Sequence, residues 1–349
     1  MFKTFINLKK MPTSMEKRTL GRTGLKVSVI GFGGIPIQRV SKEESVKVVH
    51  ACLEAGIDFF DSARGYSNSE EKIGFALMGL SKPILATKGL VDTKQDMENC
   101  IKQSLQNFRV DRIDVYQIHN VATEERLNKV LGKGGAMEAL VEAREKKTIK
   151  FIGVTGHKPE ILLKAIKTDK FDTVQFPFNA IEYRRFLPVI DEANKRNIGI
   201  IIMKPLAGGA LRHATEALKF ILSHDVDVVI PGMDSVEQVK QNAKAAMAGL
   251  TAEERKTLFD EAKRLGKDFC RMCEYCMPCP QGINITFSMI MDQYYTRYDL
   301  KDWAKQRYQQ LSGPRADACI GCGTCEGKCP YELPIVERMK RVKKNILMK

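Results

Sequence analysis

The chain has 349 residues, of which 44% are apolar and 28% charged, and it carries a formal net charge of +14. The composition excludes a disordered or fibrous chain, and the length exceeds that of one compact domain. No apolar stretch approaches the ~18 to 20 residues that span a bilayer and no secretory signal precedes the first patterned segment, so we expect a cytoplasmic protein that does not bind membranes.

Residues 1–17 form an N-terminal extension to which the sequence assigns no function, because patterning begins only at Arg18. From Val27 onwards, short β-branched runs alternate with amphipathic segments, the pattern of successive βα units around a parallel sheet. The eight expected strands span residues 27–34, 57–61, 83–88, 113–119, 149–155, 171–176, 198–205 and 226–231. The expected helices include residues 43–55, 97–108, 136–147, 159–167, 186–196, 214–223 and 236–248.

Eight such units predict that residues 18–250 close into a (β/α)8 TIM barrel, which needs roughly 250 residues. An open doubly wound sheet is the alternative, because a count of strands does not prove closure. Residues 251–268 are expected to form a connecting helix, and residues 269–349 a second, cysteine-rich domain.

Polar residues of four complementary types follow three neighbouring strands of the predicted barrel. Asp61 ends the second expected strand, Lys88 the third and His119 the fourth, and Tyr66 lies in the loop after Asp61. Catalytic groups of a TIM barrel lie at the carboxyl ends of its strands, so we expect these side chains to meet there. Each alone has a plainer explanation as a turn cap, a solvated or rim side chain, or a core histidine, but the combination favours one shared site.

Together the four side chains predict a site of proton transfer. A lysine ammonium beside a phenol lowers the pKa of the tyrosine from ~10, and an aspartate keeps the lysine charged. Tyr66 would then act as a general acid, and His119 would polarise the same carbonyl oxygen or relay the proton. With a hydride delivered to carbon, the site would reduce an aldehyde or ketone or, in reverse, oxidise the alcohol.

These motifs resemble those of the aldo-keto reductase family. The similarity rests on FFDSARGY, ILATKG, YQIHN, GVTGH and QFPFN, and it covers about residues 18 to 250. It implies a tetrad of Asp61, Tyr66, Lys88 and His119, a nicotinamide cofactor, and a small carbonyl or alcohol substrate. The family has iron–sulfur members in which a cysteine-rich tail follows the barrel, with MKPLAGG and CMPCPQGINI segments as here.

The resemblance also indicates residues that contact the nicotinamide. In the family, a Ser-Asn pair and a Gln form hydrogen bonds with the carboxamide of the nicotinamide. This chain keeps the Gln as Gln175 and has Thr155 and Gly156 in place of the pair. Met203 stands where many relatives have a stacking Tyr, and a thioether packs on a ring face only weakly. The full expected set of cofactor contacts is Gly33, Thr155, Gln175, Met203, Pro205, Leu206, Gly208, Gly232, Gln238 and Asn242.

The choice between NADPH and NADH stays open. Asn242 matches the family's adenosine-phosphate segment at a helix N-terminus, but Gly232 and Gln238 replace the Lys and Arg that NADP-preferring relatives often carry. Gly33 is equally consistent with a tight turn at the barrel mouth, and Gly208 with a flexible loop.

Eight of the ten cysteines form two closely spaced runs near the C-terminus, each ending in Cys-Pro. The second run has the CxxCxxCxxxCP spacing of bacterial ferredoxins, in which three thiolates hold one cubane and the fourth holds the other; the first run is one residue shorter. Two tetrahedral zinc sites are the alternative, although zinc usually takes separated CxxC pairs. By analogy, one 4Fe-4S cluster is expected on Cys270, Cys273, Cys276 and Cys329, and the other on Cys319, Cys322, Cys325 and Cys279.

Residues 286–309, between the two runs, have the pattern of a helix, so residues 269–349 are expected to form a small, mainly helical, two-cluster ferredoxin-like domain. Cys52 and Cys100 fall in helical patterns and are expected to be ordinary core residues.

Two oxidised clusters would lower the net charge to about +10. Because Lys and Arg are scattered rather than interleaved with aromatics, we expect no nucleic-acid partner.

Hydride chemistry and single-electron clusters must be reconciled, because a nicotinamide delivers two electrons at once and a cluster passes one. In the first hypothesis the clusters exchange electrons with a partner protein or with a bound flavin, for which no motif is present, while the barrel reduces the carbonyl. In the second, the clusters are a structural clasp or redox sensor on a conventional reductase. In the third, the chain is an electron-transfer or redox-sensing iron–sulfur protein whose barrel is not an active carbonyl reductase.

Overall fold

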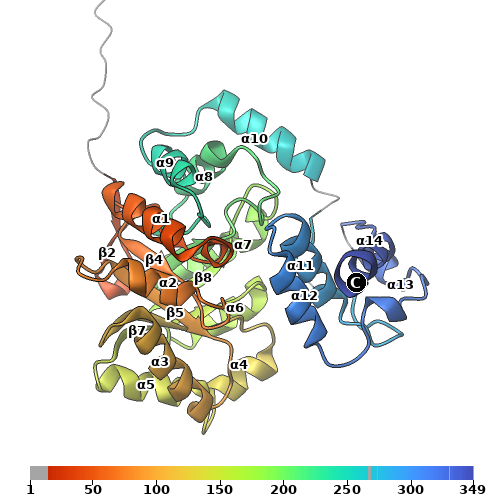
Figure 1. The fold of residues 1–349 in the computed structure, drawn as a ribbon, viewed down its shortest axis with the longest axis horizontal. Helices are drawn as coiled ribbons and strands as arrows, with labels where there is room; N and C mark the ends of the chain where they lie inside the picture. The colour runs from red at the N-terminus through yellow and green to blue at the C-terminus, as the bar shows by residue number, and fades with distance from the viewer. Residues whose placement is uncertain (1–14, 266–268, 273, 330, 349) are drawn as a thin grey trace, which may run out of the picture.

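The computed structural model describes residues 15–265, 269–272, 274–329 and 331–348. Residues 1–14 of the predicted extension and the predicted cluster ligand Cys273 therefore lie outside the described residues. Figure 1 shows an α/β body followed by a smaller helical part that ends the chain. Each part has a hydrophobic core of its own, which is the mark of two domains.

The α/β body contains eight parallel strands whose order in the sheet follows their order in the sequence. The strands are β3 (Phe32–Gly33), β4 (Phe59–Asp61), β5 (Ile84–Gly89), β6 (Ile113–Ile118), β7 (Ile149–Thr155), β8 (Thr173–Pro177), β9 (Gly199–Met203) and β10 (Val228–Val229). The sheet closes, because parallel bridges join Ile30 to Val229 and Gly33 to Gly232. This confirms the predicted (β/α)8 barrel and excludes the open sheet.

The alternation of side chains along the strands explains why these segments are apolar throughout. Phe59, Ala86, Val115 and Ile201 belong to the small cluster that fills the barrel, while their neighbours belong to the larger core between sheet and helices. Strands buried on both faces are therefore almost continuously hydrophobic. The polar exceptions lie at the carboxyl ends of the strands, where the site is found.

Helices alternate with the strands and cover the barrel. They are α1 (Lys42–Glu54), α2 (Ser69–Ala76), α3 (Lys94–Phe108), α4 (Glu124–Leu131), α5 (Ala136–Glu145), α6 (Pro159–Lys167), α7 (Tyr183–Lys195), α8 (Ala214–Leu222) and α9 (Val236–Ala245). Four of them begin where the sequence supplies an N-cap, since the side chains of Ser41, Thr93, Thr123 and Ser235 accept hydrogen bonds from backbone amides of the first turn.

The first predicted strand, residues 27–34, is split in the structure. Its start belongs to β2 (Lys26–Ser28), which pairs antiparallel with β1 (Lys17–Thr19), and only Phe32 and Gly33 join the barrel. A 3₁₀ turn at Gly21–Thr23 links the hairpin strands, and Leu20 packs into the cluster inside the barrel. The hairpin thus buries apolar residues at the amino ends of the barrel strands, a role that one continuous β-branched run does not reveal.

The C-terminal part begins after α10 (Ala252–Leu265), the predicted connecting helix. It contains α11 (Ile285–Thr296), α12 (Lys301–Gln309), α13 (Thr324–Gly327) and α14 (Ile335–Val342), with a 3₁₀ turn at Ala316–Ala318 and a π turn at Lys343–Leu347. The single helix expected over residues 286–309 is wrong: Asp299 adopts a left-handed φ of 53°, and Leu300 N bonds back to Tyr294 O. No glycine or proline marks this reversal in the sequence.

The C-terminal domain packs on the barrel through α11 and α12, which lie nearer to the barrel than α13 and α14 do (Figure 1). Polar contacts join the two parts. Lys158 Nζ pairs with Glu274 Oε2 at 2.5 Å, and Arg307 Nη1 donates to Gly65 O at 3.3 Å. Among the described helices, none combines the length and the apolar character that a membrane crossing requires.

Candidate active site

A cleft of about 330 Å³ opens at the carboxyl ends of the strands, within the size range of small-molecule sites. Asp61 and Tyr66 of the predicted tetrad lie in its wall, and so do all the predicted cofactor contacts except Thr155. The opposite wall belongs to the C-terminal domain, through Tyr294, Arg297 and Tyr298. The cleft therefore lies between the two domains, which the sequence did not predict.

A buried ion pair forms the floor of the site. Lys88 Nζ donates to Asp61 Oδ1 at 2.5 Å and to Ser62 O at 2.7 Å, and both charged side chains are almost completely buried. Burial raises the pKa of Asp61 and lowers the pKa of Lys88, and each partner's charge opposes the shift of the other. Two buried charges in direct contact compensate each other's desolvation.

Gln117 extends this pair into a network. It lies opposite Lys88 in the register of β5 and β6, so its side chain is in the same layer of the barrel. Its Nε2 donates to Asp61 Oδ2 at 3.2 Å and to Gln175 Oε1 at 2.8 Å. Gln175, the expected carboxamide reader, is thereby linked to Asp61. Gln117 was missed by sequence reasoning, although it is a polar residue near the carboxyl end of an expected strand.

Tyr66 lies above the pair. The Lys88 ammonium is 5.3 Å from the centroid of the Tyr66 ring, and the rings of Tyr66 and His119 meet edge to face with centroids 6.1 Å apart. Burial raises the pKa of Tyr66 well above its usual value, and nearby Tyr294 adds to this shift. The four residues lie together as expected, but the pKa of Tyr66 is raised rather than lowered, because desolvation dominates.

His119 is held as a neutral imidazole. Burial lowers its pKa well below the usual range, and the charges of Lys88 and Arg126 act in the same direction. Its Nδ1 is buried and has no hydrogen-bond partner within the described residues. A neutral ring with an unfilled polar atom suits an oxygen-bearing ligand, because buried polar atoms are normally paired.

The glycines of the predicted cofactor site have structural roles of their own. A Cβ on Gly33 would lie 2.7 Å from Ile230 O, and one on Gly232 would lie 2.6 Å from Pro36 Cγ, so both allow the barrel seam to close. Gly208 has a φ of +65° and packs against the ring of Tyr298. Thr155 does not line the cleft; its Oγ1 accepts a hydrogen bond of 2.7 Å from Asn120 N.

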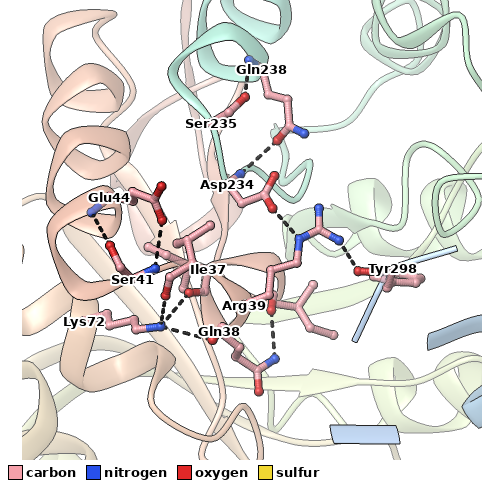
Figure 2. Close-up of polar contacts among 12 residues, drawn as sticks. Ile37, Gln38, Arg39, Ser41, Glu44, Lys72, Asp234, Ser235, Gln238 and Tyr298 are labelled. Carbon is pink, nitrogen blue, oxygen red and sulfur yellow. Dashed lines mark hydrogen bonds and ion pairs between the residues drawn. The ribbon is translucent and has the colours of Figure 1, made fainter. Parts of the chain in front are cut away.

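The adenosine end of the predicted cofactor site is bridged by Arg39 (Figure 2). Its guanidinium contacts the Asp234 carboxylate on one side and Tyr298 O of the C-terminal domain on the other. Gln238 Oε1 in turn accepts from Asp234 N at 2.8 Å, just before α9. Arg39 thus brings a cation to the end where Gly232 and Gln238 lack one. No pattern in the sequence had indicated Arg39.

A cavity in the C-terminal domain is lined by Cys270, Cys276 and Cys329, together with apolar side chains that include Met289 and Leu333. Cysteines of both runs meet here, as the ferredoxin analogy expects for the first cluster.

Of the second expected set, Cys279, Cys319 and Cys325 pack around the domain core and Cys322 is exposed. Within the described residues, no three Cys, His, Asp or Glu side chains gather around one point as a single metal ion requires. A cubane cluster does not require its ligands to meet at one point, because each thiolate binds a different iron atom.

Iron content tests the two expected clusters. If both clusters are held as expected, Cys276→Ala and Cys325→Ala should each lower the iron from about eight to about four atoms per chain, because each would remove an expected ligand of a different cluster. Cys52→Ala is the control, since Cys52 is buried in the barrel core. Iron and zinc are measured by mass spectrometry on anaerobically purified protein. Stoichiometric zinc without iron would contradict the assignment.

Comparison with known proteins agrees with this picture of two domains. Residues 29–217 match the model of the Aldo/keto reductase family, and residues 269–334 match that of a 4Fe-4S dicluster domain. An L-galactose dehydrogenase from Arabidopsis thaliana is 26% identical over 67% of this chain and 88% of its own length. An uncharacterized oxidoreductase from Bacillus subtilis, YqkF, is 24% identical over 72% of this chain and 97% of its own.

Among solved structures, the holo form of the aldo-keto reductase AKR11C1 from Bacillus halodurans superposes with a TM-score of 0.61. It is 24% identical and covers 72% of this chain and 96% of its own length. At that identity the likeness supports the fold alone.

Proposed function

Because the chain belongs to the aldo/keto reductase family and carries a 4Fe-4S domain, we propose that it reduces an aldehyde or ketone, or oxidises the corresponding alcohol, with a nicotinamide cofactor and Tyr66 as the acid–base group. One observation carries this proposal. The Lys88 ammonium, which is paired with Asp61, lies 5.3 Å from the centroid of the Tyr66 ring, and Asp61 and Tyr66 line a cleft at the carboxyl ends of the barrel strands.

The cleft supports nicotinamide as the cofactor. Gln175 and Met203 would hold the nicotinamide, and Gly208, Gln238 and Asn242 the phosphate end. The bound cofactor supplies the hydride. NADH and NADPH both remain compatible with the residues present, because Arg39 faces the adenosine end but is already paired with Asp234.

In reduction, the proton comes from Tyr66. Its raised pKa keeps the phenol protonated at neutral pH, so the proton is in place when the carbonyl oxygen gains charge. The Lys88 ammonium then stabilises the phenolate left behind, and Asp61 keeps that ammonium charged. Neutral His119 orients the carbonyl oxygen from the other side.

The dependence of kcat on pH should reflect this. Reduction should proceed at a nearly constant kcat from about pH 6 to about pH 9, because the pKa of Tyr66 is raised well above its usual value and that of His119 is lowered well below its own. Oxidation of the alcohol needs the phenolate, so its kcat should rise with pH over the same range. Steady-state rates in both directions measure this. A reduction rate that falls tenfold between about pH 7 and about pH 8 would contradict it.

The direct test is an anaerobic assay of NADH and NADPH oxidation with a panel of aldehydes and ketones. We expect carbonyl-dependent oxidation of at least one dinucleotide. If no carbonyl compound is reduced while the protein is folded and contains iron, the proposal fails.

The alternative, an electron-transfer or redox-sensing iron–sulfur protein, is favoured by the cavity that gathers three cysteines next to the barrel. In that case NADH or NADPH should neither bleach the clusters nor reduce a carbonyl. For the barrel reductase, we propose that the clusters serve electron transfer with a partner protein or structural support. We further propose domain boundaries at residues 18–250, 251–268 and 269–349, and a cytoplasmic location.

A further inference from the structure

The C-terminal domain contributes a cation beside the loop that carries Tyr66. Arg307 of α12 reaches the loop that carries Tyr66, where its Nη1 donates to Gly65 O at 3.3 Å. Its guanidinium also stacks on Trp303, with Cζ 5.0 Å from the ring. A Cβ on Gly65 would lie 3.7 Å from Nη1, so the guanidinium packs directly against this glycine.

Arg307 differs from Lys88 and Arg39 in how it is paired. Lys88 is neutralised by Asp61, and Arg39 by Asp234. Arg307, by contrast, forms no ion pair in the part of the chain that the structure describes, and a single long hydrogen bond to Gly65 O is its only one. A guanidinium has five N–H donors in a planar fork, which matches a carboxylate.

The position of Arg307 is close enough to affect the chemistry. Its charge lowers the pKa of His119 and opposes the rise in the pKa of Tyr66. A half-buried cation beside the acid–base group raises the local concentration of anions, which draws a negatively charged ligand to that end of the cleft.

We propose that the substrate is a carbonyl compound that also carries a carboxylate, and that Arg307 of the iron–sulfur domain binds this carboxylate while the carbonyl meets Tyr66 and His119. The inference rests on the proposed function and names its substrate class. It gives the second domain a part in substrate binding that is independent of the redox role of its clusters.

The test compares terephthalaldehydic acid with its methyl ester, which differs mainly in charge. Wild type should favour the acid about 10- to 100-fold in kcat/KM, the range expected for a charge-assisted hydrogen bond. Arg307→Met should bring this ratio close to one, and Arg307→Lys should keep part of it, because charge remains without the fork. Lys301→Met is the matched control, since Lys301 lies exposed on the same helix beside Asp299.

Circular dichroism and iron content verify that each variant is folded and loaded. A wild-type ratio near one, or an equal loss for both substrates in Arg307→Met, would overturn the proposal, because Arg307 would then only hold the domains together. If wild type reduces neither compound, the full panel of aldehydes and ketones still decides on the proposed function, and calorimetry with the acid and the ester decides whether Arg307 binds a carboxylate. Tighter binding of the acid than of the ester, lost in Arg307→Met, supports Arg307 as the group that binds the carboxylate. Equal binding of both compounds, or no binding of either, overturns it.

Discussion

Replacing Tyr66 by Phe should lower kcat for carbonyl reduction by about 100- to 10,000-fold, the usual contribution of a general acid. The substitution removes only the hydroxyl, and the ring keeps its edge-to-face contact with His119. The dissociation constants of NADH and NADPH should therefore change little. Stopped-flow rates and dinucleotide fluorescence titrations measure the two quantities.

Tyr275→Phe is the control for this substitution, because Tyr275 is 64% exposed in the C-terminal domain and does not line the cleft. It should reduce carbonyls as fast as wild type. If Tyr66→Phe also does so, another group supplies the proton, and the acid–base assignment of Tyr66 is wrong.

Replacing Lys88 by Met should abolish measurable reduction and also destabilise the barrel. The substitution leaves the Asp61 carboxylate buried without its cation, and breaking a buried pair on one side costs about 3–5 kcal/mol. Asp61 keeps its bond from Gln117, which offsets only part of this. Urea unfolding followed by far-UV circular dichroism gives the change in stability.

Two further variants distinguish the loss of this buried ion pair from the effect of removing any lysine side chain. Lys88→Met with Asp61→Leu removes both charges and should recover most of the lost stability without any activity. Lys150→Met breaks a partly exposed pair with Asp114 and should cost less than about 1 kcal/mol. A Lys88→Met protein as stable as wild type would mean that the pair is neutral in the folded state.

The architecture was predictable from the sequence because it follows from local patterns. Alternating runs and amphipathic segments gave the barrel, and the position of Asp61, Lys88 and His119 at strand ends gave their common location. The errors arose where local patterns do not reveal a break in the chain. The reversal at Asp299 contains neither proline nor glycine, and Gly31, between the two parts of the first predicted strand, lies within one apolar run. Periodicity alone therefore predicts a continuous element at both places.

The rest of the site depends on contacts between distant segments. Arg307 meets Gly65 across 242 residues, and Arg39 meets Tyr298 across 259. Such pairs arise only when the second domain docks on the barrel, and no spacing within a motif encodes them. The pKa of Tyr66 was misjudged for the same reason, because burial raises it and the nearby Tyr294 and Tyr298 of the second domain add to the shift.

The most direct test of the account follows deuterium from the cofactor to the product. Wild type is incubated anaerobically in ordinary water with NADH or NADPH that carries deuterium at both positions of the reactive carbon of the nicotinamide, together with an aldehyde that it reduces. If hydride passes from the nicotinamide to a carbonyl that Tyr66 protonates, the deuterium should appear on the alcohol carbon, and Tyr66→Phe should form this product far more slowly. An alcohol whose new carbon-bound hydrogen comes from water would show that electrons arrive by another route, and would contradict the account.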